Sequence, residues 1–240
     1  MTDNLPTLGT NRTDKLVAAL RGGTGAIPLV GSIIGEIISN VIPNQRVDRI
    51  VDFLRILDAR LGQFEEGELR ERMNEESYVD LLEDGLHQAA RALSEERRKQ
   101  IAALLAHSLS SEDLERIQQK KLMQVLSELN DVEIIILKSH GMREPARGAF
   151  LDKHQDIIYG PSVHMGSSQV EVDQAAVHNT YLQHLKRLGL IEARYRRIPR
   201  GELPEFDEKT GMIKASHETI TSLGRLLLRY IDEDAGERAA

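Results

Sequence analysis

The stretch RVDRIVDFLRILDARLGQF, residues 46–64, carries the clearest structural signal in the chain. Its apolar side chains recur at steps of three and four residues, and charged residues occupy positions between them. This spacing predicts an amphipathic α-helix with one face turned toward a core. The predicted core face consists of Val47, Ile50, Val51, Leu54, Leu57 and Leu61.

Helical patterns continue from this stretch toward the C-terminus. Apolar periodicity covers 78–93, Ser94 is a suitable N-cap for the next helix, and another pattern covers 110–129. Together they predict an all-helical bundle over residues 13–128 with short connections.

The pattern changes after residue 129. Asn130 and Glu133 have the spacing of a capping box that starts a helix, and Gly141 is suited to end it. Residues 141–172 are rich in Gly, Pro and other turn formers, and predict an irregular segment with at most short strands.

The remaining residues predict a helix, a hairpin and a final helix. The helix begins at Asp173, the two strands cover 191–198 and 212–221, and the final helix covers 221–231. This order is typical of a winged-helix domain. The predicted fold class is therefore mainly α, an N-terminal helical bundle followed by a small α+β winged-helix-like domain over residues 129–232.

Composition limits the classes of protein. Of the 240 residues, 40 % are hydrophobic, which is enough to form the cores of two domains. The chain has no cysteine, which excludes disulfides, thiolate metal sites and cysteine nucleophiles. Residues 1–12 and 233–240 are expected to be a disordered lead and a frayed tail. The start of the chain lacks the pattern of a secretory signal, so we expect a cytoplasmic protein.

The most apolar stretch is PLVGSIIGEIISNVIP, residues 28–43. Glu36 and the flanking prolines argue against a membrane span, which needs about 20 apolar residues. Two interpretations remain: a helix buried in the bundle, or a surface that docks transiently on a membrane or a partner. The apolar residues concerned are Leu29, Val30, Ile33, Ile34, Ile37, Ile38, Val41 and Ile42.

A candidate nucleic-acid surface lies in the C-terminal half. Between residues 186 and 200, six Lys or Arg residues stand against one acid, although the whole chain has a net charge of −7. In a DNA reader the second helix would present Gln174, His178, Asn179 and Gln183 to base edges. The phosphate contacts would come from Lys186, Arg194, Arg196, Arg197 and Arg200.

Two features favour a protein-interaction domain instead. The irregular segment replaces the expected middle helix, and Glu202, Glu205, Asp207 and Glu208 at the tip of the wing repel phosphate. A winged helix that packs against a protein is thus the alternative to one that reads DNA.

Catalytic and metal-binding patterns are not found. The sequence has no Gly-x-Ser-x-Gly turn, phosphate-binding loop or dinucleotide fingerprint, so we expect no enzyme, no cofactor and no small-molecule substrate. The histidines of the C-terminal half lack the close spacing of metal ligands. They are His140, His154, His164, His178, His184 and His217.

Four segments together resemble a family. They are GAIPLVGSIIGEIISNVIPNQRVDRIVDFLRIL (25–57), LNDVEIIILKSHG (129–141), YLQHLKRLGLIE (181–192) and ITSLGRLLLRYI (220–231). In layout they resemble the abortive-infection alpha-type bacterial proteins, with a Gly-rich apolar N-terminal helix, a helical middle and a degenerate winged helix. The resemblance implies a cytoplasmic bacterial role in phage defence or stress response, without a known chemistry or functional residues.

The resulting hypothesis is a non-catalytic regulatory or interaction protein that binds a protein partner or self-associates. The first alternative is a sequence-specific DNA-binding transcription regulator. The second is a membrane-active effector that uses the helix over 28–43.

Overall fold

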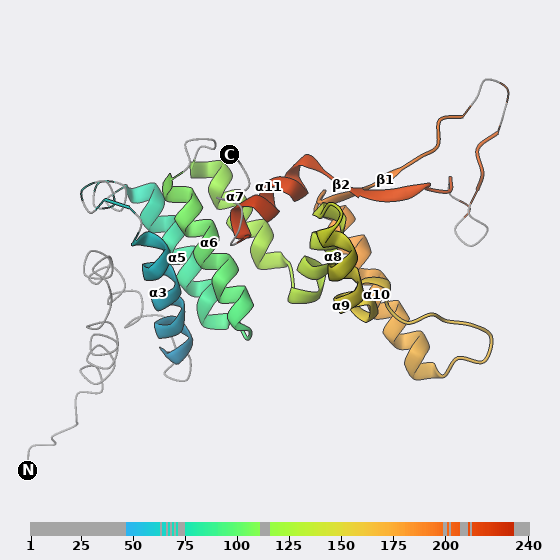
Figure 1. Cartoon of the computed structure of the whole chain (residues 1–240), viewed down its shortest axis with the longest axis horizontal. Coiled ribbons are helices and arrows are strands. Elements are labelled where there is room, and N and C mark those ends of the chain that lie inside the picture. The colour runs from blue at the N-terminus through green and yellow to red at the C-terminus, as the bar shows by residue number, and fades with distance from the viewer. Residues whose placement is uncertain are drawn as a thin grey trace, which may run out of the picture. The chain divides into compact units, whose positions relative to one another are not determined.

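The computed structural model describes residues 47–232 apart from 63, 66, 68, 70, 72–74, 111–115, 199, 200, 202, 207–210 and 212. The predictions for the lead, the 28–43 segment, Arg200 and the tail concern residues outside this part of the chain. The described part is mainly helical and contains a two-stranded antiparallel sheet (Figure 1). The prediction of a mainly α chain is confirmed.

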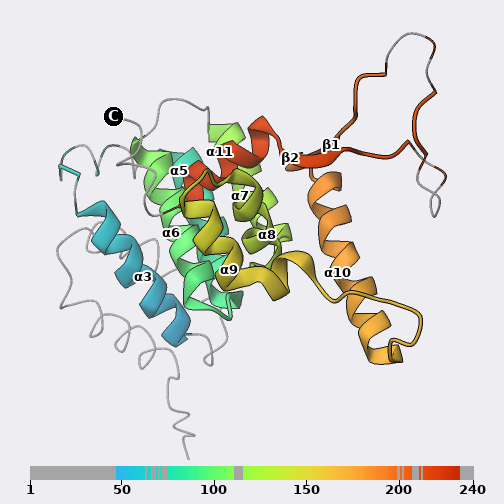
Figure 2. The ribbon, with the colours of Figure 1, turned by 45° about the vertical axis from the view of Figure 1, so that its right-hand side comes forward.

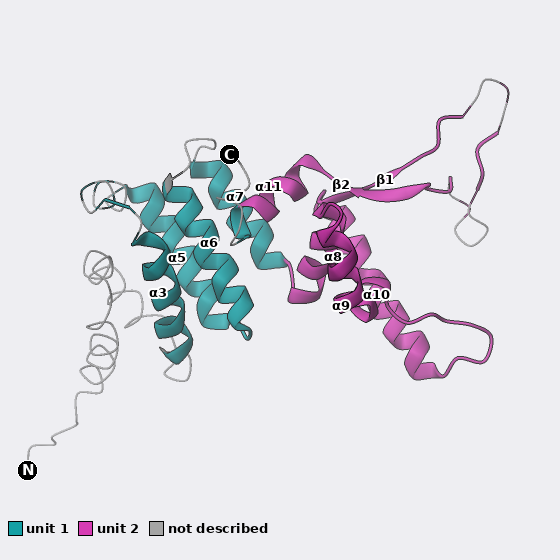
Figure 3. Cartoon of the chain, in the orientation of Figure 1, with its two compact units in different colours: residues 1–128, 230–240 teal, residues 129–229 magenta. Residues whose placement is uncertain are grey.

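The chain divides into two compact units (Figure 3). Unit 1 comprises residues 1–128 and 230–240, and unit 2 comprises residues 129–229. Unit 1 contains helices α3 (Val47–Leu61), α5 (Glu76–Arg91), α6 (Glu95–Ser110) and α7 (Arg116–Glu128).

Helix α6 is the central helix of unit 1. It contacts α3, α5 and α7, and its side chains are buried on nearly all sides from Gln100 onward. The alanines at 102, 103 and 106 permit this, because small side chains let neighbouring helices approach closely. A helix with apolar residues all round is a core helix rather than an amphipathic surface helix.

The core face predicted for α3 is largely correct. Ile50, Leu54, Leu57 and Leu61 are buried, and Phe53 joins them with no exposed surface. Val51 is only half-buried, which corrects its place in the prediction. A spacing of three or four residues does not decide which residues at the edge of an apolar face are buried. Whether Val51 or Phe53 is buried therefore depends on the surface that α3 packs against.

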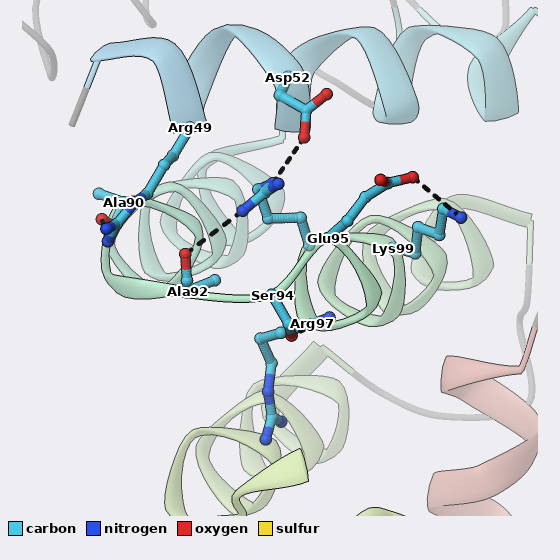
Figure 4. Close-up of polar contacts among 9 residues, drawn as sticks. Arg49, Asp52, Ala90, Ala92, Ser94, Glu95, Arg97 and Lys99 are labelled. Carbon is cyan, nitrogen blue, oxygen red and sulfur yellow. Dashed lines mark hydrogen bonds and ion pairs between the residues drawn. The ribbon is translucent and has the colours of Figure 1, made fainter.

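The connection between α5 and α6 is held by side chains from two helices (Figure 4). The predicted N-cap is confirmed, since Ser94 Oγ accepts a hydrogen bond of 3.1 Å from the backbone N–H of Arg97. Arg98 on α6 donates to Asp52 on α3 at 2.7 Å and to the carbonyl oxygen of Ala92 at 3.4 Å. Arg98 therefore ties α3 to the turn that follows α5.

Unit 2 is built around α8. The elements of the C-terminal half are α8 (Asp131–Gly141), α9 (Ala146–Tyr159), α10 (Gln169–Arg187), β1 (Ile191–Arg194), β2 (His217–Ile220) and α11 (Ser222–Ile231). Helix α8 contacts α9, α10 and β2. Its predicted capping box is confirmed, with Asn130 and Glu133 each accepting from the other's backbone N–H. The buried apolar side chains include Ile134, Ile136, Leu137, Leu185, Leu190, Ile191, Ile220 and Leu227.

The two strands form a hairpin, and the long connection between them, residues 195–216, is called the hairpin excursion. Ile191 pairs with Ile220 and Arg194 with His217 in an antiparallel register. Farther out, Phe206 and Ile213 form an isolated bridge, and the N–H of Lys214 donates to the carbonyl oxygen of Glu205 at 2.8 Å. The strands are shorter than the predicted 191–198 and 212–221, because ladder pairing ends where the excursion begins.

Two further predictions for unit 2 are wrong. The segment 141–172 is not irregular throughout, because α9 occupies residues 146–159 within it. Helix α10 begins at Gln169 rather than Asp173, because Ser168 and Glu171 form a second capping box. Three helices therefore precede the hairpin, whereas the sequence predicts two.

Candidate binding surface on unit 2

The polar residues predicted to read bases lie on α10, but not all on its exposed side. Gln174, Asn179 and Gln183 are exposed. His178 is half-buried, and its Nε2–H donates to the carbonyl oxygen of Ile157 on α9 at 2.9 Å. His178 therefore links two helices of unit 2.

The predicted phosphate-binding residues near the sheet are partly neutralised. Lys186 Nζ lies 2.5 Å from the carboxylate of Glu218, and Arg194 lies 2.7 Å from that of Glu192. An ion pair within the protein competes with phosphate for the same cation, so these two positions are poorly placed for DNA binding.

Arg196 and Arg197 differ, since neither forms an ion pair with a described residue. They are exposed and follow strand β1, which ends at Arg194. Together with Lys214, Leu203 and Ile213 they line a hollow of about 320 Å³. This hollow brings three basic side chains together with apolar side chains and one carboxylate, that of Glu205.

A larger groove, which the sequence interpretation missed, lies between α9 and α10. It has a volume of about 470 Å³ and is lined by side chains of three helices and the connection after α9. On α10 its wall is formed by Val170, Gln174, Val177 and Tyr181, at spacings of four, three and four residues. That periodicity is visible in the sequence, and recognition of the Ser168–Glu171 capping box would have placed it on one helix.

The end of α9 is shaped to receive His178. Gly160 has a φ of 64°, and a Cβ there would lie 2.5 Å from the His178 ring. Glycine permits both the backbone angle and the close approach of the imidazole. The hydrogen bond from His178 to Ile157 then holds α10 against α9 on one side of the groove.

Exposed apolar side chains gather at two places in unit 2. Val170 and Val177 on α10 are 64 % and 52 % exposed. Others on or between α9 and α10 are Tyr159, Val163, Met165 and Val172, and those of the hairpin excursion are Tyr195, Ile198, Leu203, Phe206 and Ile213. A patch of this kind is typical of an interaction site, whereas a single exposed apolar residue is ordinary.

A half-buried histidine in unit 2 predicts acid sensitivity. Burial lowers the pKa of His140 below its ordinary 6.5, and the charges of Arg147 and Lys186 act in the same direction. The charge and the backbone carbonyl of Glu218 oppose this shift of the pKa without cancelling it. Below about pH 6.5 the unfolded chain therefore binds more protons than the folded chain. The free energy of unfolding then decreases as the pH is lowered from about 6.5 through the lowered pKa of the folded state.

The corresponding test compares the wild type with His140→Gln in urea unfolding at about pH 7.5 and about pH 5.5. We expect the wild type to lose stability on acidification and the variant to lose less. Some acid sensitivity should remain, because burial and Lys153 also lower the pKa of His154. An equal loss in both proteins would contradict the assignment to His140.

The described residues form neither a metal cluster nor a membrane-spanning helix. No three His, Asp or Glu side chains there lie close enough to share a metal ion. No described helix is long and apolar enough to cross a bilayer. The 28–43 segment lies outside the residues concerned, so its interpretation stays a prediction.

Comparison with protein families finds no matching family model. Comparison with curated proteins and with solved structures finds no significant match. Function is therefore inferred from the side chains themselves.

Proposed function

We propose that unit 2 is a winged-helix-like module that binds a protein partner, and that the chain acts without catalysis as a regulatory or interaction protein. The order of elements supports the module. Three helices, α8, α9 and α10, precede an antiparallel hairpin and a final helix, which is the order of a winged-helix domain. Helix α9 supplies the middle helix that the sequence interpretation lacked.

The single observation that carries the choice of a protein partner is the surface of α10. From residue 169 to 185 this helix has two acids, Glu171 and Asp173, and no Lys or Arg. Its exposed side chains include Val170 and Val177. A helix that enters a groove of DNA needs cations near the phosphates, whereas apolar side chains with a polar surround suit a protein interface.

DNA binding is the second candidate, and the hollow of the hairpin favours it. Arg196 and Arg197 are exposed there, and a wing can contact phosphates. Lys214 contributes less, because its Nζ lies 3.7 Å from the carboxylate of Glu205. The resemblance to the abortive-infection alpha-type proteins is compatible with either partner and adds the proposal of a bacterial role in phage defence or stress response.

Two measurements on the full chain separate these candidates. We expect fluorescence anisotropy with mixed DNA fragments to show no salt-dependent binding, and we expect Arg196→Ala/Arg197→Ala to change nothing. We also expect cross-linking in native cells to join Lys153, exposed on α9, to another polypeptide. Salt-dependent DNA binding that the double variant abolishes, without cross-links from Lys153, would contradict the proposal.

A further inference from the structure

We propose that the groove between α9 and α10 binds a segment of the partner that presents aliphatic side chains flanked by Lys or Arg. This inference rests on the proposed function and specifies the chemistry of the partner. The groove's apolar lining comes from α8, α9 and α10, with contributions from Val132, Ile157, Val170, Val177 and Tyr181.

The openness of the groove favours a polypeptide over a small molecule. Val170 and Val177 remain more than half exposed although they line it. A small-molecule pocket encloses most of its ligand, whereas an open trough along a helix receives the side chains of one face of a partner segment. The volume of about 470 Å³ accommodates a few aliphatic side chains.

The groove is also held open before binding. His178 is tied to Ile157 by a hydrogen bond of 2.9 Å, and its ring meets that of Tyr181 edge-on at 6.2 Å between centroids. Both rings belong to residues that line the groove. A preformed wall of this kind lowers the entropic cost of association.

The charges of the groove select the partner. Asp156 and Asp173 line it, and no Lys or Arg does. Neither carboxylate forms an ion pair with a described residue, and Asp173 accepts only a hydrogen bond of 2.8 Å from the Gln169 amide. Lys153, three residues before Asp156 on α9, is not among the lining residues.

A purely aliphatic partner would displace water from these two carboxylates without replacing the hydrogen bonds that the water donates, and this desolvation is unfavourable. An acidic partner would add repulsion, and phosphate would be repelled for the same reason. A Lys or Arg beside the aliphatic side chains satisfies both carboxylates, so it is the complementary chemistry.

Three synthetic peptides of about 14 residues test this chemistry on the full chain. The first is an amphipathic helix of Leu, Ala and Lys, the second replaces every Lys with Glu, and the third replaces every Leu with Ser. We expect the first to bind at least about tenfold more tightly than either of the others. The third peptide also controls for general attraction, because the chain has a net charge of −7.

Amide chemical-shift mapping locates the bound peptide. We expect the shifts to concentrate on residues 156–161 and 170–181, which border the groove. Equal affinity for the acidic peptide, or shifts centred on the hairpin excursion, would overturn the inference.

Matched variants separate the groove from its surroundings. Asp156→Asn and Asp173→Asn should each weaken binding of the first peptide about threefold, and together about tenfold. Asp152→Asn removes the same charge from an exposed position of α9 outside the lining, and should change affinity less than twofold. Val177→Thr should weaken binding about fivefold, whereas Val172→Thr, outside the lining on the same helix, should not.

Failure of this inference is distinguishable from failure of the proposed function. If no peptide binds the groove while Lys153 still cross-links to a partner in cells, the partner chemistry is wrong and the protein-binding function stands. If groove variants match the wild type in peptide affinity, the inference is overturned whatever the cross-links show.

Discussion

Gly224→Ala is expected to destabilise unit 2 severely, by about 3 kcal/mol or more. A Cβ at this position of α11 would lie 2.4 Å from the carbonyl oxygen of Leu190 and 2.7 Å from Ile220 Cγ1. The Leu190 carbonyl cannot move freely, because it accepts a hydrogen bond of 3.0 Å from the backbone N–H of Thr221, whose hydroxyl donates to the neighbouring Gly189 carbonyl at 2.7 Å. The gain in helix propensity from Gly to Ala, about 1 kcal/mol, is too small to offset that clash.

The matched control is Gly85→Ala in α5 of unit 1. Its Cβ would lie 2.9 Å from Leu105 Cδ1, the end of a flexible side chain that can shift. We expect a cost of about 1 kcal/mol or less, since helix propensity offsets part of the crowding. Thermal unfolding and hydrogen exchange followed by mass spectrometry measure both variants, with exchange reporting each unit separately. Equal stability of the two variants would refute the close packing of α11 on the Leu190 carbonyl.

Glu133→Ala is expected to cost about 2–3 kcal/mol, because it removes hydrogen bonds to a buried carboxylate from both a side chain and the start of a helix. Glu133 is only 2 % exposed. Its Oε1 accepts from His184 Nδ1 at 2.6 Å, and its Oε2 accepts from the backbone N–H of Asn130 at 2.8 Å. Alanine removes the Glu133 half of the capping box, while the Asn130 side chain still accepts from the backbone N–H at 133. It also leaves the imidazole of His184 without its acceptor, so α10 loses this polar contact with α8.

The same motif at the start of α10 provides the control. Glu171 accepts from the backbone N–H of Ser168 at 2.7 Å, but this capping box is exposed to water. Glu171→Ala should therefore cost only about 1 kcal/mol. We expect hydrogen exchange to show faster exchange along α8 and α10 in Glu133→Ala and only at the first turn of α10 in Glu171→Ala. Similar exchange in the two variants would show that the Glu133 to His184 contact contributes little.

Local chemistry explains which elements were predictable. The spacing of Ile50, Leu54, Leu57 and Leu61 defines α3, and Ser94 caps α6, because periodicity and capping involve residues close together in the chain. Ser168 carries the same kind of signal at the start of α10, although the helix was predicted to begin at Asp173. The mainly α class follows from such signals.

Helix α9 shows where local signals mislead. It contains Gly148, follows Pro145, departs from helical angles at His154, and has no fully buried side chain. Residues of these types favour turns, and without a buried stripe there is no apolar period to recognise. The helix is recognisable only from its contacts with α8.

The pairing of charges depended on the tertiary structure. Lys186 stands in a basic run of the sequence, yet the fold brings Glu218 to it across 31 intervening residues. Arg194 pairs instead with Glu192, which lies two residues earlier on the same face of β1. The groove likewise exists only once α9 lies against α10, bringing Asp156 and Asp173 to one apolar trough. Sequence alone determined helix α3 and the caps at Ser94 and Asn130, because these depend on neighbours within about four residues. The pairing of Lys186 with Glu218, and the exposure of apolar side chains beside Asp156 and Asp173, were decided by packing between segments far apart in the chain.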